Sequence, residues 1–449
     1  MAPEVVLLMV VASPALVFLF LALLWLLGVE MSERRTAQLT CSVGVLITAG
    51  CAWLGWTLLQ TQTPIAWTGN AWFRAGEYEF DLDLIADRLS LPLMTLTAVL
   101  TGLVGAFSRR YLHRDPGYQR FYVLLNLFLF GSLLGLSAGS FDLLIGGWEL
   151  VGISSTLLVA FFYQRPDPVR NSAYVYSMYR VGDLGLLLGV FVLHYMAGTA
   201  EDSHLFPGSW PLQQSSVGPL ASLLTALLFL ISAAAKSAQV PFSGWLPRAM
   251  EGPTPSSAIF YGAISVHMGP YLLLRIQPIL NHSTAASMAV AGVGLATVAL
   301  GTLLHRAMPD AKASLAYASM TQLGVIFIEI GFGFPRLALL HIVGHAAVRT
   351  LQLLRAPSIL QDYRRVHAAA GGQMGQTGGH YEHILPEAAR MWLYRAALDH
   401  GFLDVFTSRF VVNPVLRLSR WLGQHEPMSK PESQETTSPT LSVKSVELP

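Results

Sequence analysis

Eleven long apolar stretches constrain this chain more than any other feature of its sequence. A helix rises 1.5 Å per residue, so roughly 20 apolar residues are needed to cross a hydrocarbon core of about 30 Å. Charged residues make up only 12% of the 449 residues, and the mean hydropathy is +0.49. We therefore predict an all-α, polytopic bundle of about 11 transmembrane helices. The predicted spans are 5–27, 39–59, 84–107, 118–136, 143–163, 173–196, 220–240, 256–279, 285–304, 314–334 and 338–354.

The charges between these stretches predict an orientation, because short cytoplasmic loops are enriched in Lys and Arg. Basic residues follow the odd-numbered stretches: Arg34, Arg35, Arg109, Arg110, Arg114, Arg120, Arg165, Arg170, Arg248, Arg306 and Lys312. Acidic residues follow the second and sixth: Glu77, Glu79, Asp81, Asp83, Glu201 and Asp202. We predict a cell inner membrane protein with a non-cytoplasmic N-terminus and a cytoplasmic C-terminal tail. The first stretch lacks a basic leader and a cleavage pattern, so we interpret it as a retained span.

Several function classes are disfavoured by the residues present. The formal net charge of +1 provides no basic field for nucleic acid. The two cysteines, Cys41 and Cys51, lie in an apolar stretch and form no CxxC or Cys/His pattern, so we predict no metal site. Neither a GxGxxG nor a GxxxxGK[ST] sequence occurs, and we predict no cofactor and no catalytic site within the chain.

Ionisable residues inside the apolar stretches are the functional candidates, because each costs at least about 2.5–3.5 kcal/mol at the bilayer centre. Lys236 lies in the seventh stretch, and Pro241 removes a backbone donor five residues later. A helix broken beside a lysine is typical of a transport site. The alternative is that Lys236 extends to a nearby membrane interface.

The fifth stretch contains Glu149, and Asp142 lies seven residues earlier on the same helical face. A Glu149–Lys236 pair would change protonation as the two groups move apart, and a static ion pair is the alternative. In the sixth stretch Arg180 and Asp183 are three residues apart and are expected to neutralise each other.

The eleventh stretch carries His341, His345 and Arg349 on one helical stripe. Neutral histidines pass protons near neutral pH, although satisfied core histidines and a zinc pair remain alternatives. His267 in the eighth stretch and Glu329 in the tenth are relay groups or packed polar residues.

Several of these residues stand in runs that resemble subunit L of bacterial NADH-quinone oxidoreductase, mitochondrial subunit 5 and the large subunit of Mrp cation/proton antiporters. The resemblance covers roughly residues 87 to 354. The runs are Gly147-Trp148-Glu149-Leu150-Val151-Gly152, Arg180-Val181-Gly182-Asp183, Lys236-Ser237-Ala238-Gln239-Val240-Pro241, Gly252-Pro253-Thr254-Pro255 and Lys312-Ala313-Ser314-Leu315-Ala316-Tyr317.

The resemblance implies ion translocation without a redox centre. It assigns Glu149 and Lys236 to a proton half-channel, Lys312 to a cytoplasmic-end position, and His341 and His345 to the central hydrophilic axis. Other membrane subunits would be the partners, within the lipid bilayer. The chain would then be a proton-translocating, or sodium-translocating, subunit of a complex I-like oxidoreductase.

The chain also departs from the family pattern. Tyr261 replaces an expected histidine, with His267 nearly two turns later, and Arg349 replaces an expected lysine. Arginine does not relay protons by titration. The expected second broken helix is also missing after Leu354, so the second half-channel is predicted to be incomplete. Two alternatives follow: the membrane subunit of a cation-driven inorganic carbon uptake complex, and a non-conducting scaffold.

These patterns divide the chain into four predicted parts. Residues 1–83 hold two transmembrane helices and a non-cytoplasmic loop, and 84–355 form the antiporter-like core. Residues 356–423 combine a flexible connector, rich in Ala, Gly and Gln at 367–379, with an amphipathic or partner-docking helix at 387–422. The polar tail, 424–449, is predicted to be disordered.

Overall fold

The computed structural model describes residues 2–75, 78–308, 310–369, 386–398 and 403–425. Its described part contains eleven helical segments long and apolar enough to cross a membrane, which confirms the predicted number of spans. They are α1 (Pro3–Leu26), α2 (Glu33–Thr61), α3 (Ser90–Tyr111), α4 (Tyr118–Leu136), α5 (Phe141–Val159), α6 (Pro166–Ala197), α8 (Pro219–Lys236), a segment at Thr254–Arg275, α13 (Thr284–Ala307), α14 (Ala311–Gly331) and α15 (Pro335–Ala369).

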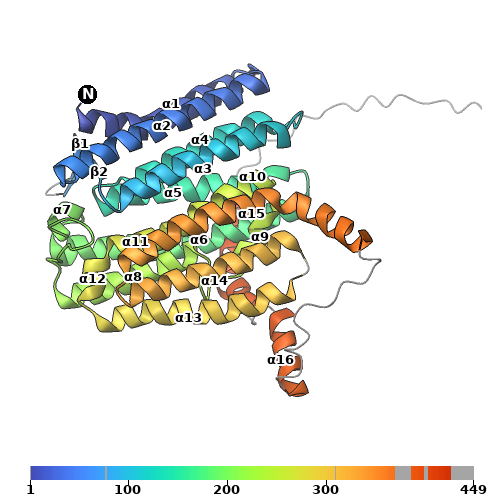
Figure 1. Cartoon of the computed structure of the whole chain (residues 1–449). Helices are drawn as coiled ribbons and strands as arrows, with labels where there is room; N and C mark the ends of the chain where they lie inside the picture. The colour runs from blue at the N-terminus through green and yellow to red at the C-terminus, as the bar shows by residue number, and fades with distance from the viewer. Residues whose placement is uncertain (1, 76–77, 309, 370–385, 399–402, 426–449) are drawn as a thin grey trace, which may run out of the picture.

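The spanning helices lie side by side in one bundle (Figure 1). Helix α4 packs against α5, α6 against α8, and α13 against α14. The Thr254–Arg275 segment is buried along its whole length, whereas only a third of the corresponding windows of α1 and α13 is buried. This eighth span is therefore the centre of the bundle, and α1 and α13 lie at its outside.

The eighth span is itself interrupted. It begins as α10 (Thr254–Ser256), continues through a π-helical turn (Ser257–Ala263), and becomes regular only in α11 (Met268–Arg275). The short helix α12 (Gln277–Asn281) follows, and α9 (Trp245–Arg248) precedes the segment. Irregular backbone at membrane depth is tolerated where protein surrounds it, and the complete burial of this span meets that condition.

A β-hairpin joins α2 to α3, which the sequence reading missed. Strand β1 (Ile65–Ala75) pairs antiparallel with β2 (Tyr78–Ala86), from Ile65 opposite Ala86 to Ala75 opposite Tyr78. The prediction that a span begins at residue 84 was wrong, because residues 84–86 belong to β2. Helix α3 starts after Asp87, whose Oδ1 accepts hydrogen bonds from the backbone N–H groups of Leu89 (3.0 Å) and Ser90 (2.7 Å).

The segment after the eleventh span also differs from the prediction. Helix α15 continues through Ala369, so the domain boundary at 356 and the start of the connector at 367 fall inside a helix. The rest of the connector, 370–379, lies outside the described residues. The region predicted as one helix at 387–422 contains α16 (Glu387–Leu398) and a continuous helical run made of α17 (Leu403–Thr407), a π-helical turn (Ser408–Val412) and α18 (Asn413–His425); residues 399–402 lie outside the described part.

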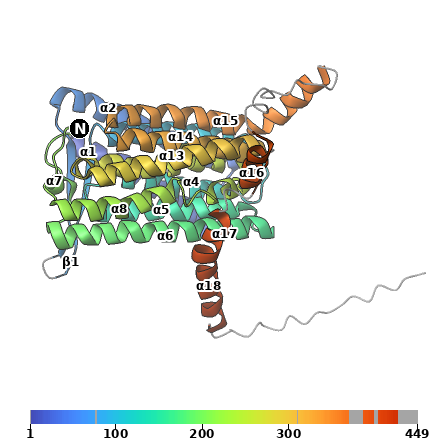
Figure 2. The ribbon, with the colours of Figure 1, turned by 90° about the horizontal axis from the view of Figure 1, so that it is seen from below.

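The C-terminal helices lie at the end of the bundle remote from the hairpin. Helices α16 and α18 run across the direction of the spanning helices (Figures 1 and 2). The Tyr174 hydroxyl on α6 lies 2.9 Å from the Thr407 hydroxyl, and this contact anchors α17 to the bundle. Gln424 and His425 are helical, and the remainder of the predicted disordered tail lies outside the described residues.

Candidate functional site: charged groups inside the helix bundle

The seventh span breaks directly after Lys236, four residues earlier than the predicted end of this span. The freed carbonyl of Ala235 accepts a hydrogen bond from the Trp245 indole N–H at 2.8 Å. The backbone N–H of Val240 donates to the Thr297 hydroxyl at 3.0 Å, and Pro241 has no N–H to satisfy. Neighbouring helices therefore satisfy backbone groups that an unbroken helix would have paired internally.

The Lys236 amine lies among aromatic rings deep in the bundle. Its Nζ donates to the Trp148 carbonyl oxygen at 2.9 Å and lies 4.8 Å and 4.5 Å from the ring centres of Trp148 and Tyr179. Lys236 is only 2% exposed. The alternative in which it extends to the membrane interface is therefore wrong.

Arg180 joins the two carboxylates of this region. Its guanidinium donates to the Glu149 carboxylate and forms an ion pair of 2.8 Å with Asp183. The other Asp183 oxygen accepts a hydrogen bond from the Trp148 indole N–H at 2.8 Å. The predicted Arg180–Asp183 neutralisation is thus present, and Glu149 is bound to Arg180 rather than directly to Lys236.

Two glycines from the sequence motifs let these groups approach. A Cβ atom on Gly152 would lie 3.2 Å from Lys236 Nζ, and a Cβ on Gly182 would lie 2.5 Å from that of Ala235. Larger residues at either position would separate α8 from α5 or α6. The motif glycines therefore set the distance between the lysine and the Glu149–Arg180–Asp183 group.

A second polar group lies between the eighth span, α14 and α15. His267 Nε2 and His345 Nδ1 are 2.9 Å apart, and His345 Nε2 lies 3.3 Å from the Ser319 hydroxyl. His267 also contacts the Ala263 carbonyl in the π-helical turn. His267 and His345 are 4% and 7% exposed, so both lie inside the bundle, and the assignment of His345 to the central axis stays a prediction.

His341 lies one turn from His345 and faces α14. Its Nδ1 is 3.0 Å from the Glu329 carboxylate and its Nε2 is 3.1 Å from the Gln322 side-chain oxygen. Arg349 continues the stripe and is 7% exposed. No group of three or more metal-binding side chains occurs among the described residues.

Lys312 lies at the start of α14, away from both groups. Its Nζ donates to the carbonyl oxygens of Met250 (2.8 Å) and Gly252 (3.1 Å), directly before the Pro-Thr-Pro run that opens the eighth span. The lysine therefore links the start of α14 to the start of the central span.

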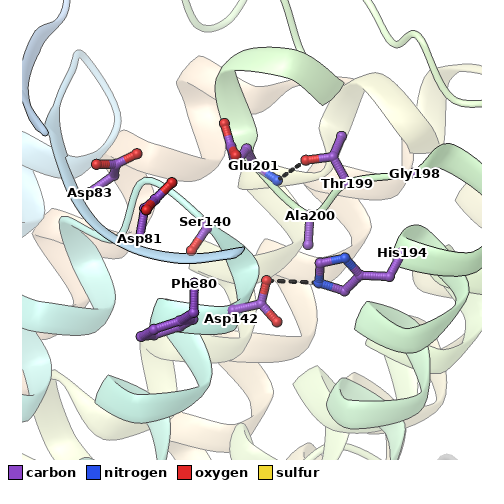
Figure 3. Close-up of a pocket in the computed structure, with 10 residues that line it drawn as sticks. All are labelled: Phe80, Asp81, Asp83, Ser140, Asp142, His194, Gly198, Thr199, Ala200 and Glu201. Carbon is purple, nitrogen blue, oxygen red and sulfur yellow. Dashed lines mark hydrogen bonds and ion pairs between the residues drawn. The ribbon is translucent and has the colours of Figure 1, made fainter. Parts of the chain in front are cut away.

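Asp142 contacts a residue that the sequence reading missed. Its Oδ2 lies 2.8 Å from Nε2 of His194 on α6, beside a cavity of about 410 Å³ at the hairpin end of the bundle (Figure 3). His194 follows Asp183 by eleven residues, about three helical turns. From this spacing the sequence could have indicated that His194 lies on the same side of its helix as Asp183. It could not have shown that Asp142 on α5 is the partner of His194.

A third charged group, also missed, lies at the same end. Arg275 forms ion pairs with Asp87 (2.6 Å) and Asp202 (3.6 Å), and all three are at most 3% exposed. Burial raises the pKa of Asp202 to about 6 despite the opposing effect of Arg275. The pKa of Asp87 is lowered, since burial is outweighed by Arg275 and by hydrogen bonds.

Two models of known protein families together match most of the chain. A family model described as NADH:quinone oxidoreductase/Mrp antiporter, TM, matches residues 138–376. A second, described as NADH-Ubiquinone oxidoreductase (complex I), chain 5 N-terminus, matches residues 72–122.

Curated relatives agree with these models. The chain is 32% identical to NADH-ubiquinone oxidoreductase chain 5 of Neurospora crassa over 356 residues, which is 78% of this chain and 48% of the relative. It is 36% identical to NADH-quinone oxidoreductase subunit L of Mycobacterium tuberculosis over 306 residues, 66% of this chain and 47% of the relative. The chain thus spans about half the length of these curated relatives.

Two solved structures share the fold. A chain of the Mrp complex from Dietzia sp. matches with a TM-score of 0.65 at 24% identity, covering 79% of this chain and 37% of the other. A chain of the membrane-bound sulfane sulfur reductase, an archaeal respiratory membrane complex, matches with a TM-score of 0.66 at 19% identity, covering 78% and 70%.

Proposed function

Because this chain belongs to the NADH:quinone oxidoreductase/Mrp antiporter family, we propose that it translocates protons, or sodium ions, as a non-redox subunit of a complex I-like membrane assembly. One observation carries the proposal: Lys236 is buried at a helix break, beside a group in which Arg180 holds Glu149 and Asp183. Such charges are costly in a membrane, and an ion path is the function that best accounts for them.

Arg180 is the group that would couple the two carboxylates to Lys236. It contacts Glu149 and Asp183 at once, so a shift towards one weakens its hold on the other. The carboxylate thus released becomes a stronger attractor for the positive charge of Lys236. Movement of Arg180 would therefore control whether the Lys236 amine keeps its proton.

The histidine group would continue the path. His267 and His345 are in contact, and His341 is joined to Glu329, so protons are able to pass between neighbouring rings and the carboxylate. Lys312 would lie at the cytoplasmic end. Arg349 stays charged and would act by its field alone.

The exposure of Glu149 and Arg180 supports a neighbouring membrane subunit. Their side chains are 25% and 31% exposed on a membrane-spanning face, where hydrocarbon is an unfavourable environment for an ion pair. A second membrane subunit covering α5 and α6 would remove this cost and bring its own charges within range. We propose that the antiporter-like core begins with α3 and includes α15, and the basic residues that follow the odd-numbered spans support an N-terminus on the non-cytoplasmic face of the inner membrane.

The named relatives favour this function over inorganic carbon uptake, because both curated proteins are NADH oxidoreductase subunits. The retained Lys236 and Glu149 favour it over a non-conducting scaffold. Copurification of the native assembly followed by mass spectrometry distinguishes the three. Flavoprotein and iron–sulfur subunits are expected, and a single large zinc protein would support carbon uptake instead.

The central test is a Lys236→Ala variant of the complete assembly in proteoliposomes that contain a pH-sensitive dye. We expect ion flux to be lost, because no other described amine lies at the helix break. The matched control is Thr225→Ala, which changes a buried polar residue three turns earlier on α8. Undiminished flux in the Lys236→Ala variant would refute the proposed function.

A further inference from the structure

A cavity at the hairpin end of the bundle contains titratable groups that the proposed path does not use. It lies between β2, the start of α5 and the end of α6, and has a volume of about 410 Å³ (Figure 3). Carboxylates of Asp81, Asp83 and Glu201 line it together with Asp142 and His194. Burial, and then the charges of Asp81 and Glu201, raise the pKa of Asp83.

The contact between His194 and Asp142 joins two spanning helices at this cavity. The imidazole comes from the last turn of α6 and the carboxylate from the first turn of α5, and Figure 3 shows the two side chains facing each other. Their side chains are 29% and 19% exposed, so the pair is accessible to the cavity and also extends between the helices.

An open strip on α5 leads from this pair towards the buried charges. Asp142, Gly146 and Glu149 follow each other at helical spacing on one face, and none of the three is buried. A Cβ atom on Gly146 would meet no atom within 4 Å. Asp142 and Glu149 are therefore separated by about 10 Å along the helix axis, with the half-buried Ile145 on one side of the line between them and the open position at Gly146 on the other.

From this geometry we propose that the His194–Asp142 pair exchanges protons between the cavity and Glu149 along the strip at Gly146. Nδ1 of the neutral imidazole takes a proton from hydronium in the cavity, which leaves water, and the ring becomes an imidazolium. Its Nε2–H proton passes to Oδ2 of the Asp142 carboxylate, which restores the neutral ring. The Asp142 carboxylic acid then releases the proton to water held in the strip beneath the second membrane subunit that covers α5, and the Glu149 carboxylate accepts it. Only N–H and O–H bonds form and break, and no electrons are transferred.

This proposal rests on the proposed ion-translocating function and adds the non-cytoplasmic end of its path. His194 is faced by carboxylates from three elements: Asp142 on α5, Asp81 and Asp83 on β2, and Glu201 before α7 (Asp202–Leu205). These negative charges concentrate protons at the cavity. Flux should therefore change when the pH is changed on this side alone.

The test compares a His194→Gln variant of the complete assembly with the unmodified assembly in proteoliposomes. Glutamine keeps a donor for Asp142 but does not titrate. We expect at least a tenfold lower flux and loss of the dependence of flux on non-cytoplasmic pH. His282→Gln, an exposed histidine at the same end of the bundle, should change neither quantity.

A second pair of variants tests the strip without altering the histidine. Gly146→Leu should fill the strip and lower flux, whereas Gly102→Leu, at another position with no atom within 4 Å, should not. Normal flux and an unchanged pH profile in both His194→Gln and Gly146→Leu would overturn this proposal. If Lys236→Ala abolishes flux in the same preparations, the proposed function stands, and if it does not, both fail.

Discussion

Two arginines in this protein each hold a pair of carboxylates, and their surroundings differ sharply. Arg275 lies between Asp87 and Asp202 at the hairpin end and is 2% exposed. Arg180 lies between Glu149 and Asp183 within the bundle, and its side chain is 31% exposed. Both groups join one guanidinium to two carboxylates, and they differ in how tightly each is enclosed.

Enclosure determines what each arginine is able to do. Asp87 also accepts hydrogen bonds from the first turn of α3, so movement of Arg275 would disturb the start of a spanning helix. Arg180 instead has an open side, and its partner Asp183 accepts a hydrogen bond from Trp148, whose carbonyl oxygen accepts one from Lys236. We infer that the enclosed group holds the fold together, whereas the open group is free to exchange partners.

The largest expected effect comes from breaking the enclosed group with Arg275→Gln. Loss of the guanidinium leaves two carboxylates buried without a cation, which typically costs about 3–5 kcal/mol. The free energy of unfolding, measured in mixed micelles with increasing denaturing detergent, should fall by this amount. Arg336→Gln, an exposed arginine at the same end of the bundle, is the control. A loss below about 1 kcal/mol for Arg275→Gln would contradict the structural role.

The contrast between these groups also shows what sequence reasoning captured. Span number follows from hydropathy and length, and the break beside Lys236 follows from a charge and a proline in an apolar run. Arg275 was overlooked although it lies inside a predicted span, because a sequence does not show that Asp87 and Asp202 meet it from 188 and 73 residues away. His194 was missed for the same reason.

The wrongly predicted boundaries of the third span and of the connector also have physical causes. Residues 78–86 alternate apolar and polar side chains, the pattern of a half-buried strand, but their last residues were assigned to the hydrophobic run that follows. Helix α15 continues to Ala369 because the Ala-rich end of the predicted connector, His367 to Ala369, has good helix formers and no Gly or Pro.

A smaller effect on stability is expected from Asp202, because its pKa is raised whereas that of Asp87 is lowered. The pKa of Asp202 is raised to about 6 from an ordinary value near 3.8, so its ionisation opposes folding as the pH rises through this interval. The free energy of unfolding should therefore fall by on the order of 1–3 kcal/mol between about pH 4 and pH 6. Asp202→Asn should remove most of that fall. An identical pH dependence in the variant would show that Asp202 does not carry the buried proton.

The smallest effect on stability is expected for Arg180→Gln, the counterpart of Arg275→Gln. Polar contacts inside membrane proteins average about 0.6 kcal/mol each, and Asp183 keeps its bond from Trp148, so the free energy of unfolding should fall by about 1–2 kcal/mol. Ion flux should nevertheless fall at least tenfold, because Lys236 loses the group that links it to Glu149. Arg180→Lys should recover part of the flux, since a cation returns without the fork that holds both carboxylates. If Arg180→Gln instead destabilises the protein as much as Arg275→Gln and leaves the flux of the folded fraction unchanged, the two arginines have the same structural role, and the distinction drawn from their enclosure is wrong.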